Sequence, residues 1–227
     1  MSNSYLDVIY DEERTPKTNY PYQLARHLSH RFSFRESGKL LELGCGRGDF
    51  LLAFKRLGFE CQGTDREIHP ALAKEIKLSR ADLGKEKFPF PDNTFDIVYH
   101  KSLIEHFYSP HHLMEETYRV LKPGGKVVIL TPDWVSTMKI FYEDITHCRP
   151  YDTTALRDTL TMYGFKNIEV EKFHQLPIVW KIPAIKIVTG LLRLFLPTVP
   201  ARKITEATGI KFFRWSVELM VLGVGTK

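Results

Sequence analysis

The stretch that decides the fold is residues 40–50, which read LLELGCGRGDF. It begins with an apolar run, passes glycines at 44, 46 and 48, and continues with apolar residues at helical spacing, Phe50, Phe54 and Leu57. This pattern predicts a buried strand that turns tightly into a helix. Because glycine has no Cβ, the turn can adopt positive φ, and a ligand can lie against the N–H groups of the helix start. The stretch therefore predicts a nucleotide-binding loop.

The residues around the glycines indicate which nucleotide this loop binds. In a loop that binds the pyrophosphate of a dinucleotide, the third glycine comes three residues after the second, and here that position is Asp49. Glu42 lies two residues before the first glycine. A carboxylate this close opposes a pyrophosphate and favours a ligand with cationic groups. The loop thus disfavours a nicotinamide-dependent oxidoreductase, an alternative that titration with both cofactors would decide.

Residues 42–48, ELGCGRG, resemble motif I of the class I S-adenosylmethionine-dependent methyltransferases, whose cofactor carries a sulfonium and an ammonium group. Further motifs follow in that family's order: an acid at 65, Asp82-Leu83, an apolar strand from Phe95, and the turn RVLKPGG at 119–125. The resemblance covers about residues 38 to 132. It implies an α/β fold with a doubly wound, mostly parallel seven-stranded sheet, the Rossmann-like methyltransferase fold.

We expect a single methyltransferase domain over residues 1–227 with four segments. Residues 1–37 form an N-terminal arm, loosely ordered to about residue 20, followed by a helix. Residues 38–173 form the cofactor-binding core, in which apolar spacing also predicts a helix over residues 67–78. Residues 174–216, called the flap below, form an apolar and basic helical insertion before the last strand, which occupies residues 217–227.

The resemblance places S-adenosyl-L-methionine at the carboxyl ends of the predicted strands. Asp65 follows the glycine loop by about twenty residues, where a parallel nucleotide fold presents an acid to two ribose hydroxyls. A helix N-cap is the alternative role for this residue. In the family an Asp-Leu pair holds the adenine, and Asp82-Leu83 matches that position. The predicted cofactor-binding residues are Glu42, Gly44, Cys45, Gly46, Asp65, Arg66, Asp82, Leu83 and His100.

Two histidines are candidates for a catalytic base. Methyl transfer from a sulfonium is an in-line displacement, so the protein mainly aligns the reactants and excludes water. An oxygen nucleophile also needs a base, and histidine suits that work at neutral pH. His106 and His147 follow the fourth and fifth predicted strands, at the edge where ligands bind in an open parallel sheet. For each, the alternative is a structural histidine near the cofactor.

No metal is predicted, because the paired histidines at 27/30 and 111/112 have no carboxylate or cysteine partners at metal-ligand spacing. The cysteines, Cys45, Cys61 and Cys148, form no CxxC pair and no disulfide framework, which fits a reducing compartment. The polar residues 1–18 contain no apolar segment typical of a secretory signal. We therefore expect a cytoplasmic protein. A cytoplasmic protein can also associate with the inner face of the membrane, and we include this location in the prediction.

The positive charge of the chain is concentrated in the flap, which has seven lysines and arginines against one acid, Glu206. Its apolar residues are interrupted by Lys181, Lys186, Arg193 and several prolines, so it should not cross a bilayer. A helix starting at Pro183 would place Lys186, Gly190 and Arg193 on one basic face, a pattern that suits an interfacial helix. A lid that packs on the sheet or on a second subunit is the alternative.

Together these patterns predict a methyltransferase that acts, at oxygen, on a small-molecule, glycan or lipid-linked acceptor. Contact with a membrane surface is expected through residues 176–200. One alternative is a non-catalytic binding subunit that keeps the cofactor fold at the membrane surface. Another is an RNA methyltransferase, although the aliphatic character of the flap and its lack of nucleic-acid motifs make a nucleic-acid partner unlikely. The sequence indicates no oligomeric state.

Overall fold

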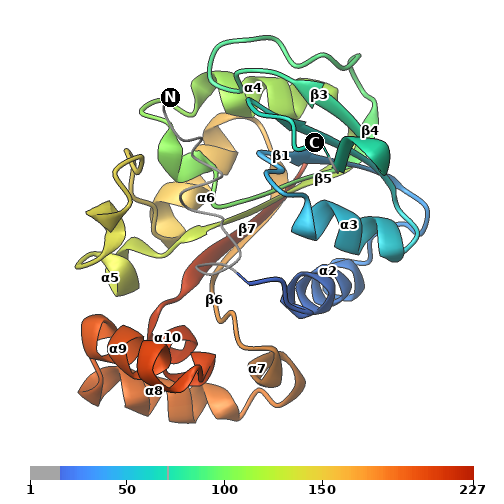
Figure 1. The fold of residues 1–227 in the computed structure, drawn as a ribbon. Helices are drawn as coiled ribbons and strands as arrows, with labels where there is room; N and C mark the ends of the chain where they lie inside the picture. Colours follow the sequence, from blue (N-terminus) through green and yellow to red (C-terminus); the bar gives the residue numbers. More distant parts are fainter. Residues whose placement is uncertain (1–15, 71) are drawn as a thin grey trace, which may run out of the picture.

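The computed structural model describes residues 16–70 and 72–227, so most of the predicted N-terminal arm lies outside the described residues. The described chain forms a seven-stranded sheet with helices on both faces (Figure 1). The strands lie in the order β3-β2-β1-β4-β5-β7-β6. Their bounds are β1 Lys39–Leu43, β2 Glu60–Asp65, β3 Lys77–Arg80, β4 Phe95–Lys101, β5 Leu121–Pro132, β6 Lys166–Phe173 and β7 Met220–Thr226.

The first five strands are parallel, whereas β7 runs antiparallel between β5 and β6. The chain moves outward from β1 to β3 and then returns to pair β4 with the other side of β1. Ligands in open sheets bind where the strand order reverses in this way, beyond the carboxyl ends of the strands. The predicted doubly wound, mostly parallel sheet is confirmed, and the ends of β1 and β4 mark the expected position of the site.

Two hydrophobic cores form on the two faces of the sheet. Successive residues of a strand point to opposite faces, so Leu40 and Tyr99 face one core, while Leu41 and Val98 face the other. Each fully buried side chain of this size stabilises the fold by about 1.5–3 kcal/mol. The first core is covered by α2 (Tyr20–Arg31) and α3 (Asp49–Arg56), and the second by α4 (His111–Val120) and α6 (Thr153–Met162).

The prediction of a helix over residues 67–78 is wrong. This segment instead contains a single 3-10 turn, η1 (Leu72–Lys74), and the beginning of β3. Leu78 pairs with Gly63 of β2, and a Cβ at Gly63 would lie only 2.8 Å from the Leu78 side chain. The pairing of β3 with β2 therefore overrides the local helical spacing. The last strand also begins later than predicted, because Val217 ends a helix and β7 starts at Met220.

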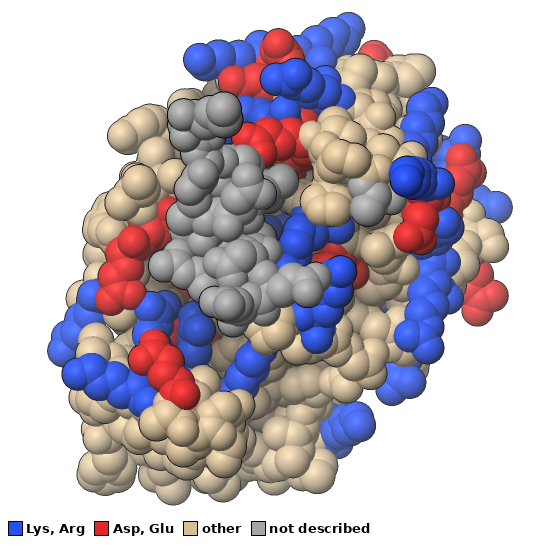
Figure 2. Space-filling view, in the orientation of Figure 1, with Lys and Arg blue, Asp and Glu red and all other residues tan. Residues whose placement is uncertain are grey.

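The flap contains four helices among the described residues, and they lie together at one end of the sheet (Figure 1). These are α7 (Pro177–Lys181), α8 (Ile185–Phe195), α9 (Thr198–Thr208) and α10 (Lys211–Val217). None of the helices in the described chain combines the length and the apolar character that a bilayer span requires. The surface of this end is mostly uncharged in the view of Figure 2.

Lys186, Gly190 and Arg193 share one face of α8 as predicted, but this face is not an outer interfacial face, because it turns toward the domain at Arg193. Its guanidinium turns inward and donates hydrogen bonds to the Ser216 carbonyl at 3.2 Å and to His174 Nε2 at 3.0 Å. These bonds orient α8 about its axis so that the polar side chain of Arg193 faces the domain. Helical spacing alone gives the two faces of α8 but not which of them packs inward.

Ion pairs fasten the flap to the rest of the domain. The buried carboxylate of Glu218 accepts hydrogen bonds from Arg202 Nε at 2.5 Å and from Arg214 Nε at 2.9 Å. Arg202 also pairs with Glu143, in the segment after β5, at 2.5 Å. The hydroxyl of Thr198 donates to the Ser136 carbonyl at 3.1 Å. The flap is therefore attached to the same segment that carries His147.

We expect Glu218→Ala to lower the free energy of unfolding by about 1.5–3 kcal/mol, because two partly exposed guanidinium groups lose their charged hydrogen-bond acceptor and Arg202 keeps only its pair with Glu143. Denaturant unfolding measures the loss, and hydrogen exchange should show faster exchange in α9 and α10. Glu206→Ala, which removes the exposed acid of the flap, is the matched control and should stay within about 0.5 kcal/mol of the original chain. Equal effects of the two substitutions would contradict the anchoring role.

Candidate active site

The loop after β1 has the backbone that its glycines predict. Gly44, Gly46 and Gly48 have φ of 65°, 49° and 78°. A Cβ at Gly44 would lie 2.7 Å from the Leu103 side chain, and one at Gly48 would lie 2.3 Å from Leu72. Both conformation and space therefore require glycine at these two positions. The N–H groups of residues 44 and 45 donate to the Thr64 carbonyl at 2.8 and 3.3 Å, which ties the loop to the end of β2.

Asp65 lies where its predicted role needs it, at the end of β2 and against the glycine loop. Its Oδ2 accepts a hydrogen bond from Gly46 N at 2.8 Å, and its Oδ1 accepts from Glu67 N at 3.3 Å. A carboxylate oxygen has two lone pairs, so each oxygen can also accept from a ribose hydroxyl. The alternative role as a helix N-cap does not apply, since no α-helix begins at this position in the described chain.

Glu42 supplies the clearest indication that the loop fits a cationic ligand. Its side chain is buried, with 4% exposure, and its Oε2 has no hydrogen-bond partner among the described residues. Burial raises the pKa of this carboxyl well above its usual range, and the nearby charges of Asp49 and Asp65 raise it further. A buried carboxylate without a partner is unfavourable. An ammonium or sulfonium group next to the glycine loop would relieve this cost, as the cofactor's charged groups can.

Asp82 and Leu83 follow β3 in a tight turn. Asp82 Oδ1 accepts from Gly84 N at 3.0 Å, and Leu83 is buried in the core beneath α4. A Cβ at Gly84 would lie 3.1 Å from the Phe107 ring, so the turn packs on the segment after β4. The predicted adenine position and the histidine segment are therefore neighbours. The adenine contact itself stays a prediction.

The remaining predicted cofactor residues differ in their positions. Arg66 is exposed, and its charge helps to lower the pKa of His106, so it lies toward the histidines. Cys45 is buried with its sulfur under the loop near Gly63, which leaves its backbone as the part next to a ligand. His100 is fully buried, and burial lowers its pKa to about 3.

The side chain of His100 points away from the predicted cofactor. Glu42 pairs with Tyr99 across β1 and β4, and adjacent strand residues point to opposite faces, so the His100 ring lies on the other face of the sheet from Glu42. Neither of its ring nitrogens has a hydrogen-bond partner in the part of the chain that the structure describes. The geometry gives no support to a cofactor contact by this ring.

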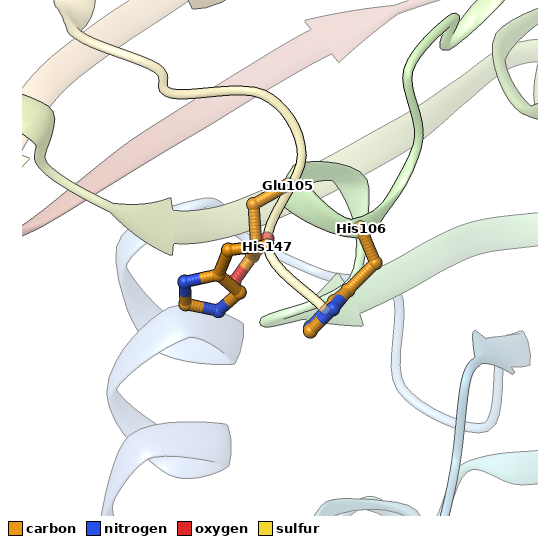
Figure 3. A group of neighbouring side chains, drawn as sticks. All are labelled: Glu105, His106 and His147. Carbon is orange, nitrogen blue, oxygen red and sulfur yellow. The ribbon is translucent and has the colours of Figure 1, made fainter. Parts of the chain in front are cut away.

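The structure brings the two candidate bases together. His106 ends η2 (Ile104–His106), just after β4, and His147 lies in the segment after β5. Their ring centroids are 4.8 Å apart (Figure 3). Cys148 N and Arg149 N both donate to the carbonyl of Glu105, at 2.9 and 3.0 Å. These backbone bonds fasten the two segments to each other and hold the rings side by side.

Hydrogen bonds decide which nitrogen of each ring carries the proton. His147 Nδ1 lies 2.6 Å from the Phe141 carbonyl, which can only accept, so Nδ1 carries the proton and Nε2 the lone pair. Thr146 Oγ1 donates to Asp144 Oδ1 at 2.5 Å and accepts from His106 Nδ1 at 2.9 Å. Burial and the neighbouring His147 lower the pKa of His106. Hydrogen bonding therefore assigns a proton to Nδ1 of both rings, and the lowered pKa of His106 favours the neutral form of that ring.

Glu105 and Thr146 belong to this site, although they are not among the site residues predicted from the sequence. Glu105 is fully buried, and burial raises its pKa to about 7. Its Oε2 accepts from Thr131 Oγ1 at 2.9 Å, and its Oε1 has no partner among the described residues. The sequence gives one indication that Glu105 belongs to the site, because it directly precedes His106. The same indication applies to Thr146, which directly precedes His147.

The donor atoms of Glu105, His106 and His147 all lie within 4.8 Å of one another. Two imidazoles and a carboxylate are a suitable donor set for a divalent transition metal. This arrangement is nonlocal, so histidine and carboxylate spacing along the sequence could not reveal it. The absence of a metal stays a prediction for this site.

Comparison with known proteins identifies the family. A model of the family described as a methyltransferase domain matches residues 16–170, which is more than half of the chain. The chain therefore belongs to this family of methyltransferase domains, and the resemblance to class I S-adenosylmethionine-dependent methyltransferases is confirmed. S-adenosyl-L-methionine is accordingly the cofactor of the family, and the glycine loop with Glu42 and Asp65 suits its charged groups and ribose.

The chain is similar to methyltransferases with different acceptors. It is 26% identical over 136 residues to the sterol 4-C-methyltransferase of Caenorhabditis elegans, covering 53% of this chain and 40% of that protein. It is 33% identical over 153 residues to phosphoethanolamine N-methyltransferase 3 of Arabidopsis thaliana, covering 59% of this chain and 30% of that protein. The chain thus spans less than half the length of these curated relatives.

A solved structure shows the same fold over nearly the whole chain. Phosphoethanolamine N-methyltransferase 2 of Haemonchus contortus, in complex with S-adenosyl-L-methionine, aligns with a TM-score of 0.64 and 18% identity. The alignment covers 98% of this chain and 59% of that protein. At this identity the likeness supports the fold and leaves the acceptor open.

We expect Asp65→Ala to weaken the affinity for S-adenosyl-L-methionine by about tenfold to several hundredfold. Hydrogen bonds to a charged group contribute about 1.5–3 kcal/mol each, and the loop also loses its bond from Gly46 N. Titration calorimetry measures the change. Asp158→Ala, an exposed aspartate on α6, serves as the control and should bind as the original chain does. Unchanged affinity in Asp65→Ala would contradict the ribose assignment.

We expect cofactor binding to release a proton from Glu42. The carboxyl has a raised pKa when free, so a cationic ligand favours its ionised form, and affinity should increase as the pH rises through that pKa. Calorimetry in buffers of different ionisation enthalpy counts the protons released. In Glu42→Gln, affinity should be lower and the pH dependence from this group lost. An identical proton release in the variant would refute the assignment.

Proposed function

We propose that this chain transfers a methyl group from S-adenosyl-L-methionine to an oxygen nucleophile of a small-molecule, glycan or lipid-linked acceptor, with His147 as the base. The observation that carries this proposal is the position of the His147 ring. Its Nδ1 proton is bound by the Phe141 carbonyl, which leaves the lone pair on Nε2. This nitrogen lies beside His106, at the edge of the sheet where the glycine loop also ends.

The surroundings of His147 suit proton abstraction. Asp144 Oδ2 lies 3.9 Å from His147 Nε2. Although burial opposes its ionisation, hydrogen bonds from Thr146 lower the pKa of Asp144 below its usual range, so the carboxylate is charged at neutral pH. A negative charge at this distance stabilises the imidazolium that forms when Nε2 accepts a proton. His106 packs edge-on against the ring and, with Thr146, holds it in position.

The proposed mechanism gives each of these residues a separate role. When bound, S-adenosyl-L-methionine supplies the electrophilic methyl group. Gly44, Gly46 and Asp65 hold the ligand at the end of β1, and Glu42 balances its positive charge. His147 accepts the hydroxyl proton of the acceptor as the oxygen attacks. Because the residues act by position and proton transfer, no covalent intermediate with the enzyme is required.

Two observations support an acceptor with an apolar part. The flap is bonded to the segment after β5, by Arg202 to Glu143 and by Thr198 to Ser136, so its surface adjoins the segment that carries the proposed base. One relative is by its name a sterol methyltransferase and another a phosphoethanolamine methyltransferase. A non-catalytic subunit is disfavoured, since such a chain would have no use for a buried acid with an unpartnered oxygen, as Glu42 has among the described residues.

We expect His147→Gln to lower turnover by about a hundredfold to ten-thousandfold, the usual contribution of a general base, without weakening cofactor binding. Turnover is measured as S-adenosylhomocysteine formed with extracted cell lipids, and separately with water-soluble acceptors. His111→Gln changes an exposed histidine on α4 and should retain full turnover.

Unchanged turnover in His147→Gln would refute the role of base, and no turnover of the original chain with any acceptor would favour the non-catalytic alternative. Repeating the assay with a chelator tests the prediction that no metal takes part. Loss of turnover on chelation, restored by a divalent ion, would contradict it and assign Glu105, His106 and His147 to a metal instead.

A further inference from the structure

The outer face of α8 is apolar and open to solvent. Ile187, Leu191, Leu194 and Phe195 are 69%, 55%, 74% and 82% exposed. Their spacing of four, three and one residues places them on one side of the helix. Val188, on the same helix, is also exposed. An ordinary surface helix turns such residues inward, so α8 presents the opposite arrangement.

The inward face of α8 is polar and well bonded, which shows that the orientation is specific. Thr189 is fully buried, with its hydroxyl 3.1 Å from His174 Nε2. Arg193 donates to the same nitrogen and to the Ser216 carbonyl. Burial, together with the charge of Arg193, lowers the pKa of His174 to about 4, so this imidazole is neutral and accepts. Rotating the helix to bury its apolar face would break these bonds.

The charges near this face are positive. Lys181 ends α7, and Lys186 lies in the first turn of α8, between Arg193 of the polar face and Leu194 of the apolar face in helical projection. Both lysines are exposed, and neither forms an ion pair with another described residue. The flap as a whole has seven basic residues against the single acid Glu206. In Figure 2 the flap end of the molecule is a broad uncharged surface with lysines and arginines along its border.

We propose that the flap docks on an anionic membrane surface through the outer face of α8, with Ile187, Leu191, Leu194 and Phe195 inserted at the boundary between headgroups and acyl chains. Lys181 and Lys186 then lie among the headgroup phosphates. An apolar face bordered by lysines is the pattern that binds such interfaces. In a cell this places the chain on the inner, anionic face of a membrane.

Charge argues for a bilayer over a second copy of this chain. In a two-fold contact each patch meets itself, so the lysines beside α8 would be brought toward the lysines of the other copy. Like charges placed together disfavour association. An anionic bilayer complements both the apolar residues and the lysines. The inference concerns docking and does not depend on the proposed reaction.

The experiment is vesicle flotation of the full chain with phosphatidylcholine alone and with phosphatidylcholine mixed with phosphatidylglycerol. The original chain should float with the anionic vesicles, and less so as salt is added. Leu194→Glu with Phe195→Glu should reduce partitioning by about tenfold or more. Lys181→Glu with Lys186→Glu should reduce it about fivefold for each lysine. The changed side chains are exposed, and thermal unfolding confirms that each variant folds.

Matched controls are Met162→Glu and Lys166→Glu, which change an exposed apolar and an exposed basic residue on α6 and β6. Both should float as the original chain does. The proposal is overturned if the original chain stays off all vesicles, or if the controls lose binding as strongly as the α8 variants. It is also overturned if sedimentation without lipid shows a dimer that the α8 variants dissociate, since the face is then a contact between copies.

Discussion

The rest of the site depends on the attachment of the glycine loop to the end of β2. The Thr64 carbonyl accepts from the N–H groups of Gly44 and Cys45, and the Asp65 carboxylate accepts from Gly46 N. These bonds fix the shape of the loop without help from a ligand. A loop that is already ordered loses little conformational freedom on binding, so more of the interaction energy remains for affinity. The carboxylate of Glu42 is then held at a defined place beneath the loop.

A second set of backbone hydrogen bonds fixes the two segments that carry the candidate bases. The carbonyl of Glu105 accepts from Cys148 N and Arg149 N, and thereby joins the segment after β4 to the segment after β5. The bond of His106 Nδ1 to Thr146 Oγ1 and that of His147 Nδ1 to the Phe141 carbonyl then set the tautomers of the two rings. The Nε2 atom of His147, which is the base in the proposed mechanism, is thus oriented by groups that need not touch an acceptor.

The sequence predicts what is local and misses what depends on distant partners. The strand, glycine turn and helix of residues 40–57 are predictable because apolar spacing and positive φ are properties of the segment itself. The expected helix over 67–78 fails because Leu78 pairs with Gly63, a contact outside the segment. The places of His106 and His147 after two strands make each a candidate base, but their convergence and the inclusion of Glu105 depend on the bonds between the segments that follow these strands.

The orientation of α8 in the flap determines which of its faces is exposed, and the flap is also attached to the segment that leads to His147. Arg193 and Thr189 hold the polar face of α8 against the domain, and this leaves the apolar face outside. Glu218, through Arg202, ties the neighbouring α9 to Glu143 in the segment that leads to His147. The two attachments act on one packed group of helices, so in the proposed docking the surface that binds α8 would also set the direction in which the histidines face. The two proposals are thereby linked, because the position of a docked chain would determine the side from which an acceptor reaches Nε2 of His147.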